Sequence, residues 1–165
     1  EDRDRERNRA QALQVQLEQL RRSAREVVDL DPSAAAFLDE VRAAYERRYT
    51  ESDQKEWPLQ EIRLHPDFLA SLDALQGISR DKVLEVCADV GTGRVHSIPA
   101  RETHMLRKGE GPGPVRIRSR DGAQAWRCYL QQRTPQARRL HWWALPGGGV
   151  ELAHVGNHDD YTCPE

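Results

Sequence analysis

The stretch RRLHWWALPGGGVELAHVGNHDDY, residues 138–161, decides the fold that this chain predicts. Apolar residues from 139 to 145, a Pro-Gly-Gly-Gly turn and apolar residues from 150 to 155 together indicate a β-hairpin. Titratable side chains then follow closely: His154, His158, Asp159, Asp160 and Tyr161. The hairpin therefore places imidazoles, carboxylates and a phenol at the rim of a sheet, which is a rigid place to hold groups for proton transfer.

Length and composition suit a single water-exposed domain, or a smaller domain with an appendage. Of the 165 residues 32% are charged, and no apolar run approaches the roughly 20 residues that span a bilayer. The first ten residues, EDRDRERNRA, are the reverse of a signal peptide, and the missing initiator Met leaves open that the chain is a piece of a longer protein. The three widely spaced cysteines, Cys87, Cys128 and Cys163, argue against a disulfide scaffold, so we expect a reducing, cytoplasmic setting.

Charge is unevenly distributed along the chain. Residues 1–56 hold 11 basic and 14 acidic residues, whereas residues 101–140 hold 10 basic and 3 acidic ones. Such a local excess of positive charge is typical of proteins that bind a polyanion. Because this basic segment leads directly into the His-Asp-Asp-Tyr end, we expect nucleic acid as the partner. The alternative is a solvated, arginine-rich surface.

The first 56 residues predict a helical extension. Apolar residues alternate at spacings of three and four, which is the a/d seam of a short coiled coil. The seam consists of Ala10, Leu13, Leu17, Leu20, Ala24 and Val27. Asp31 and Pro32 interrupt it and start a second helix that runs to about Tyr49. The polar segment 50–56 predicts a linker, so we expect a helical hairpin or dimerisation arm over 1–56 and a domain over 57–165.

Residues 57–165 predict an α+β domain. A strand at 59–64 precedes a helix that starts at His65 and ends at Gly77. Ser79 caps a second helix, which Gly91-Thr92-Gly93 ends. Further strands are expected at 115–118, 125–131, 139–145 and 150–155, with irregular structure over 94–113, where the GEGPGP segment predicts a loop. This order indicates a small antiparallel sheet with a helical hairpin on one face.

These segments resemble the RelE/ParE superfamily of bacterial toxins over about residues 60–161. The similar motifs are IRLHPDFLASLDAL, THMLRKG, AWRCYL, RRLHWWAL and VELAHVGNHDDY. The resemblance implies a RelE-like fold and the toxin of a toxin–antitoxin system, acting as a ribonuclease on messenger RNA in the ribosomal A site. Its partners would be RNA, the ribosome and a cognate antitoxin. The helical extension and the GEGPGPVRIRSR segment depart from the family pattern.

The resemblance also implies the residues of the site. His158 matches the family's terminal catalytic His or Arg, and Tyr161 matches its aromatic residue near the C-terminus. Arg127 and Arg139 match its strand arginines. The implied roles fit the chemistry, because RNA cleavage without a metal needs a base, an acid and cations for the charged phosphorane. Histidine carries protons near neutral pH, and arginine binds phosphate through two nitrogens.

We therefore expect His158 as general acid or base, with Asp160 as the group that orients it or acts as its counterpart, and we expect no metal and no cofactor. The expected catalytic residues are His158, Asp160, Tyr161, Arg127 and Arg139. The expected substrate-binding residues are His104, Arg107, Lys108, Arg116, Arg118 and His141. Strand parity alone leaves His141 either in the site or on an exposed face.

Two other classes of function fit the same residues. One is a non-catalytic module that binds nucleic acid or protein through the basic face and assembles through the helices. The other is a ParE-like inhibitor of DNA gyrase. Because the extension is acidic and the domain face is basic, the extension is also a candidate built-in antitoxin-like segment.

Overall fold

The computed structural model describes residues 13, 14, 16, 17, 31–109, 111–134 and 136–165. Most of the expected coiled-coil seam lies outside the described residues; Leu13 and Leu17 are described, helical and exposed. The chain divides into two compact units between Ala36 and Phe37. The division therefore falls 20 residues before the boundary that the sequence predicts at 56/57.

In the described part of residues 31–165, four α-helices and five strands make up the α+β fold that the sequence predicts. The α-helices are α2 (Pro32–Arg48), α3 (Glu51–Glu56), α4 (Phe68–Asp73) and α5 (Arg80–Thr92). Two 3-10 helices follow, η1 (Arg94–Ser97) and η2 (Pro99–Arg101). The strands are β1 (Ile62–Leu64), β2 (His104–Met105), β3 (Gln124–Tyr129), β4 (Arg139–Ala144) and β5 (Val150–Gly156).

The strands form one mixed sheet in the order β1-β5-β4-β3-β2. Neighbours β2–β3, β3–β4 and β4–β5 pair antiparallel, whereas β1 pairs parallel with β5. The prediction of a purely antiparallel sheet is wrong at this edge. Short turns force antiparallel pairing only between strands that are consecutive in the chain, and the long connection from β1 to β5 easily provides the crossover that a parallel pair needs.

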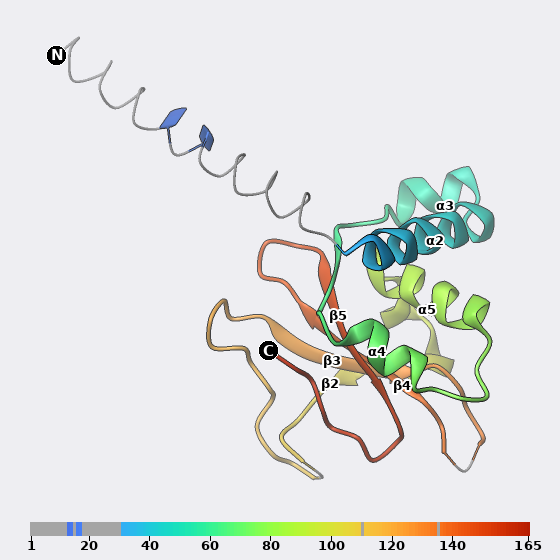
Figure 1. Cartoon of the computed structure of the whole chain (residues 1–165), viewed down its shortest axis with the longest axis vertical. Coiled ribbons are helices and arrows are strands. Elements are labelled where there is room, and N and C mark those ends of the chain that lie inside the picture. The colour runs from blue at the N-terminus through green and yellow to red at the C-terminus, as the bar shows by residue number, and fades with distance from the viewer. Residues whose placement is uncertain (1–12, 15, 18–30, 110, 135) are drawn as a thin grey trace, which may run out of the picture. The chain divides into compact units, whose positions relative to one another are not determined.

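Alternation along the strands gives the sheet two different faces. Leu140 and Trp142 of β4, with Leu152 of β5, point into the core that the helices cover. Helices α4 and α5 pack on this face, and α2 packs on them (Figure 1). Phe37 of α2 meets Phe68 of α4 with ring centres 5.5 Å apart. Burying each such large apolar side chain stabilises the fold by about 1.5–3 kcal/mol.

From Phe37 onward helix α2 belongs to this domain, whereas the sequence predicts it as part of the extension. Its buried side is formed by Phe37, Val41, Ala44 and Tyr45, and Tyr49, directly after the end of the helix, is also buried. The Tyr49 hydroxyl donates to the buried carboxylate of Asp89 on α5 at 2.8 Å. Nitrogens of Arg48 and Arg101 lie 3.2 and 3.8 Å from the same carboxylate. A buried charge is tolerated only with such partners, so these contacts tie α2 firmly to α5.

Local capping explains where two helices begin and end. Ser79 accepts a hydrogen bond from the Lys82 backbone N–H at the start of α5, and Gly93 ends it with a left-handed φ of 77°, as the sequence predicts. The segment 50–56 is not a linker but helix α3, because Thr50 and Asp53 form a reciprocal capping box.

Three further elements differ from the predictions. Helix α4 ends at Asp73 rather than at Gly77. The expected strand at 115–118 is reduced to isolated bridges of Val115 with Arg107 and of Ile117 with Gln124. The preceding prolines have no backbone N–H to donate, and the preceding glycines leave the backbone flexible. A longer ladder therefore does not form. Strand β2 lies in a region expected to be irregular, and it was missed because two residues carry no periodicity.

The sheet face away from the helices carries a second, smaller core. It consists of Leu106, Ala123, Ala125, Trp143, Ala153 and Cys163. After β5 the chain turns back across this face as a segment that we call the C-terminal strap, residues 157–164 (Figure 1). A ring nitrogen of His141 contacts the Thr162 carbonyl oxygen at 2.6 Å. The Trp143 indole N–H donates to the Pro164 carbonyl oxygen at 2.7 Å. The strap therefore lies along β4.

Candidate functional site

Four neighbouring strands each place one titratable side chain in a single row across the sheet. His104 of β2 pairs with Arg127 of β3, Arg127 with His141 of β4, and His141 with His154 of β5. Side chains directly opposite one another in antiparallel strands are near enough to touch. Arg127 Nε donates to His104 Nε2 at 2.8 Å, and the rings of His141 and His154 have centres 5.8 Å apart. We call these four residues the histidine–arginine row.

A β-bulge in β5 brings His154 into this row. Trp142 pairs with Leu152 and His141 with His154, so Ala153 is the extra residue. With strict alternation His154 would share the face of Leu152, beneath the helices. The bulge keeps Leu152 in the helix-covered core while it turns His154 toward His141 on the opposite face.

Arg127 and Arg139 bring two guanidinium groups to this face without an acidic partner. Arg139 is 4% exposed; its Nη2 donates to the Tyr129 hydroxyl at 2.7 Å, and its guanidinium lies over the Tyr129 ring. Among the described residues, no Asp or Glu forms an ion pair with either arginine, and Arg127 Nη1 and Arg139 Nε and Nη1 are buried without a hydrogen-bond acceptor. Because burying an unpaired charge is costly, these nitrogens are where binding of an anion would be most favourable.

Burial changes the protonation of two histidines in the row. Burial lowers the pKa of His141 to about 4. Its Nδ1–H donates to a carbonyl oxygen, so the buried Nε2 is an acceptor that has no partner among the described residues. Burial, with the charges of Arg127 and Arg139, lowers the pKa of His104 against the opposing effect of the Glu102 carbonyl. Both imidazoles are therefore neutral at pH 7 and hold lone pairs beside two cations.

The C-terminal strap covers the row. The Tyr161 ring lies over Arg127, whose guanidinium carbon is 4.8 Å from the ring centre. The Thr162 carbonyl oxygen accepts from His141. Arg116, an expected substrate-binding residue, instead donates from Nη1 to the Tyr161 carbonyl oxygen at 3.0 Å and so holds the strap.

Asp160 fixes the strap to β5. Its carboxylate lies 2.7 Å from His154 Nε2 and accepts from the Thr162 backbone N–H at 2.8 Å. It fits only because Gly156 has no side chain: a Cβ there would lie 2.9 Å from Asp160 Cβ. Burial by itself would raise the pKa of Asp160, but hydrogen bonds from Thr162 and His154 outweigh it and lower the pKa to about 2.

His158 lies at the border of the site. It is exposed, its Nδ1 lies 2.8 Å from Asp159 Oδ1, and its ring centre is 6.3 Å from that of Tyr129. The carboxylate beside His158 is thus Asp159, whereas Asp160, expected to orient His158, contacts His154. His158 borders the Tyr129–Arg139 pair at one end of the site, and His104 borders Arg127 at the other.

Arg118 is placed inside the protein rather than on the binding face. It is 1% exposed, and it bonds Asp121 through Nε and Nη2 at 3.0 and 2.6 Å and Glu151 through Nη1 at 2.5 Å. The hydrogen bonds that Arg118 donates are the main cause that lowers the pKa of Asp121 to about 2. Two carboxylates therefore already neutralise this guanidinium.

Arg107 and Lys108, the other expected binding residues, are exposed on the chain that follows β2. Arg107 Nη1 donates to the Gly113 carbonyl at 2.7 Å. Of the eleven expected site residues, the structure groups six on the face described above; they are Arg127, Arg139, His104, His141, Asp160 and Tyr161.

Two residues of this face, His154 and Tyr129, were not among the expected site residues. Tyr129 is two positions after Arg127, and the period of two in a strand could have predicted that they share a face. His154 could not be found in this way, because simple alternation assigns it to the wrong face and no sequence pattern marks the bulge at Ala153.

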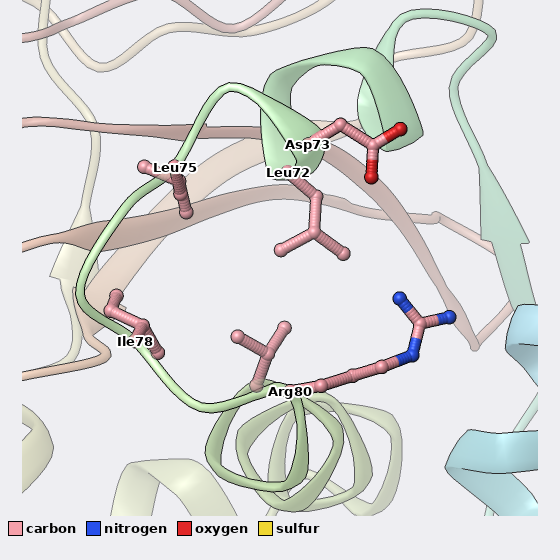
Figure 2. A pocket seen from close by; sticks show the side chains of 6 residues that line it. Leu72, Asp73, Leu75, Ile78 and Arg80 are labelled. Atoms are coloured by element: carbon pink, nitrogen blue, oxygen red, sulfur yellow. The ribbon is translucent and has the colours of Figure 1, made fainter.

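A hollow of about 200 Å³ lies elsewhere, between α4 and the start of α5. Figure 2 shows Leu72, Leu75 and Ile78 around it, with Arg80 along one side. Arg80 is engaged by Glu40 through two hydrogen bonds of 2.7 and 3.0 Å. Asp73 also lines the hollow, which therefore combines apolar and charged side chains but holds none of the residues of the histidine–arginine row.

Across the described ranges, no three His, Cys, Asp or Glu side chains are grouped as a metal site would require. No helix within the same ranges is long and apolar enough to cross a membrane. Comparison of the chain with protein-family models, with curated proteins and with solved structures gave no match.

Proposed function

We propose that this chain is a toxin-like endoribonuclease of the RelE/ParE type that cleaves RNA, messenger on the ribosome above all, without a metal. The observation that carries the proposal is the pair of guanidinium groups of Arg127 and Arg139, whose buried donors have no anionic partner among the described residues. Phosphate oxygens are acceptors that such a guanidinium binds through two parallel hydrogen bonds. The resemblance of residues 60–161 to the toxin motifs supports the same function. A toxin of this type would act in the cytoplasm and would have an antitoxin as its partner.

In the proposed reaction Arg127 and Arg139 bind the scissile phosphate and stabilise the charge of the phosphorane. His104 is neutral, and its Nε2 accepts from Arg127 in the free protein. When the guanidinium turns to the phosphate, this lone pair becomes free to take the 2′-hydroxyl proton. The 2′-oxygen then bonds to phosphorus, the bond from phosphorus to the 5′-oxygen breaks, and His158 protonates that oxygen. The product is a 2′,3′-cyclic phosphate.

Two aromatic side chains supply base contacts in this proposal. Tyr129 and Tyr161 are partly exposed, and each already stacks with an arginine. A base splayed onto an aromatic ring gains about 1–3 kcal/mol. The tyrosines would hold the nucleotides on either side of the cleaved bond.

The test is cleavage of single-stranded RNA, free and on translating ribosomes, by the full chain and three variants. Arg127→Lys and His158→Ala are expected to lose about 100- to 1,000-fold in rate. Arg42→Lys, on the exposed side of α2, is the matched control and keeps full activity. Circular dichroism establishes that each variant is folded.

The outcomes separate the function classes. RNA binding without cleavage by the wild type would replace the nuclease with the non-catalytic binding module. If the wild-type protein stops DNA supercoiling while translation continues, its target is DNA gyrase and the protein is a ParE-like inhibitor. Full activity of Arg127→Lys would overturn the proposed phosphate contact.

A further inference from the structure

We propose that the C-terminal strap holds the site in a closed state and that binding of an RNA phosphate displaces it. This inference rests on the proposed function, because it concerns the regulation of the same site. It adds a conformational step before the chemistry, in which residues 160–164 of the strap lift from the histidine–arginine row. The Tyr161 ring is then free to stack on a base, while His158 stays beside Tyr129.

The strap covers Arg127, one of the two arginines that an RNA phosphate must reach. Arg127 Nη1 and two nitrogens of Arg139 are sealed from solvent. The Tyr161 ring lies over Arg127, and the Thr162 carbonyl oxygen occupies the Nδ1 side of His141. A phosphate cannot contact Arg127 Nη1 while the strap is in this position.

A few polar contacts hold the strap. Asp160 contacts His154 and packs on Gly156, Trp143 donates to the Pro164 carbonyl oxygen, and Arg116 to that of Tyr161. The apolar part is small, since Cys163 is the one strap residue in the second core that is nearly fully buried. Such a segment can open without unfolding the sheet.

The closed state carries an energetic cost. In the closed state two arginines are buried with donors that have no acceptor, which is unfavourable. A phosphate supplies charge-assisted hydrogen bonds to those donors, so it binds the open state far better than the closed one. A ligand shifts an equilibrium only through such a difference in affinity, and here the phosphate can make these hydrogen bonds in the open state alone.

Cys163 provides a measurement of opening that does not depend on cleavage. It is 4% exposed, and burial raises the pKa of its thiol to about 12, so it reacts slowly while the strap is closed. Cys87 and Cys128 are 0% exposed in the core beneath the helices and serve as internal controls for global unfolding. The rate at which a thiol reagent modifies Cys163 therefore reports the open fraction.

The experiment measures this rate for the full chain, with and without a 2′-O-methyl RNA that cannot be cleaved. Asp160→Asn removes the charge that holds His154, and we expect the Cys163 rate to rise about tenfold and RNA to bind more tightly. Thr162→Val, which removes the hydroxyl bonded to Asp160, should act in the same direction. Asp39→Asn makes the same substitution on the exposed side of α2 and should change neither value. Wild type with saturating RNA should match Asp160→Asn.

Slower modification of Cys163 in the presence of RNA would overturn the proposal, because the strap would then be a fixed wall of the site. Unchanged rates in both Asp160→Asn and Thr162→Val would do the same. If RNA speeds the modification and yet the wild type cleaves no RNA, the strap proposal stands while the ribonuclease proposal fails.

Discussion

The ring of Tyr161 covers the guanidinium of Arg127, with the guanidinium carbon 4.8 Å from the ring centre. This contact joins the C-terminal strap to the middle of the sheet. A cation–π pair of this kind contributes about 0.5–2 kcal/mol. Charge-assisted hydrogen bonds to a phosphate are worth about 1.5–3 kcal/mol each, so an RNA phosphate that makes two of them outcompetes the tyrosine. This difference explains how the strap can cover the histidine–arginine row in the free protein and uncover it when RNA binds.

Two substitutions of Arg139 distinguish the contribution of its charge to RNA binding from the contribution of its planar guanidinium. Arg139→Gln should lower kcat/KM for RNA about 100-fold and reduce the slope of log affinity against log salt by about 0.7, because one phosphate contact is lost. Arg139→Lys keeps the charge, so it should keep the salt slope but lose most of the rate, since lysine lacks the planar fork. An unchanged slope for Arg139→Gln would show that Arg139 touches no phosphate.

The pH dependence of cleavage should reveal His104. Because burial and neighbouring arginines lower its pKa below the usual 6.5, the acidic limb of the kcat/KM profile should lie below pH 6.5. His104→Asn should be nearly inactive and should lack this limb. An acidic limb retained in His104→Asn would assign the base to another residue.

His141 should make the protein sensitive to acid. Its pKa is about 4 in the folded chain against 6.5 in the unfolded one, so protons bind the unfolded chain preferentially. The stability due to neutral His141 is complete above about pH 6.5 and is lost as the pH falls toward 4, by about 3 kcal/mol in all. Urea unfolding at pH 7 and pH 4.5 measures this loss. His141→Asn keeps a donor for Thr162 and should show a smaller difference between the two pH values.

Gly156→Ala should loosen the strap. The new methyl group would lie 2.8 Å from Asp160 Cγ and 2.9 Å from its Cβ, so Asp160 must move away from His154. We expect a loss of about 1–3 kcal/mol of stability, as for other overpacked sites. Urea unfolding checks this value. In an Asp160→Gly background the same substitution should cost much less, and an equal cost in both backgrounds would contradict the contact.

Removing residues 1–56 should unfold the domain rather than activate it. The deletion takes away α2 with Phe37, Val41 and Tyr45, and it removes the Tyr49 hydroxyl from the buried Asp89. We expect no cooperative thermal transition by circular dichroism for residues 57–165. Residues 31–165, which keep α2, are the control and should melt cooperatively. A cooperative transition for residues 57–165 would mean that α2 is dispensable.

The sequence predicts the local elements of this fold well. The PGGG turn between two apolar runs predicts β4 and β5 and their antiparallel pairing, and Ser79 and Gly93 mark the ends of α5. These features depend on residues close together in the chain, where turn and capping chemistry act directly. The same reasoning missed the Thr50–Asp53 capping box, although that motif is also local.

Long-range features could not be predicted in this way. The parallel pairing of β1 with β5 and the docking of α2 on α5 join segments that no local rule connects. Arg118 looked like one of several exposed basic residues, yet Glu151, 33 residues away, and Asp121 bury and neutralise it. The charge of a segment is visible in its sequence, but which arginines remain free for a partner depends on which carboxylates the fold brings to them.

The sequence by itself determined the α+β class, the C-terminal hairpin and the basic, histidine-rich end, because turn residues, apolar periodicity and charge act over a few residues. Only the tertiary structure decided that His104, Arg127, His141 and His154 share one row. That row requires strand register, and a single bulged residue, Ala153, sets the face of His154. Register is fixed by how the two faces of the sheet pack, so it depends on the whole domain and not on the motif alone.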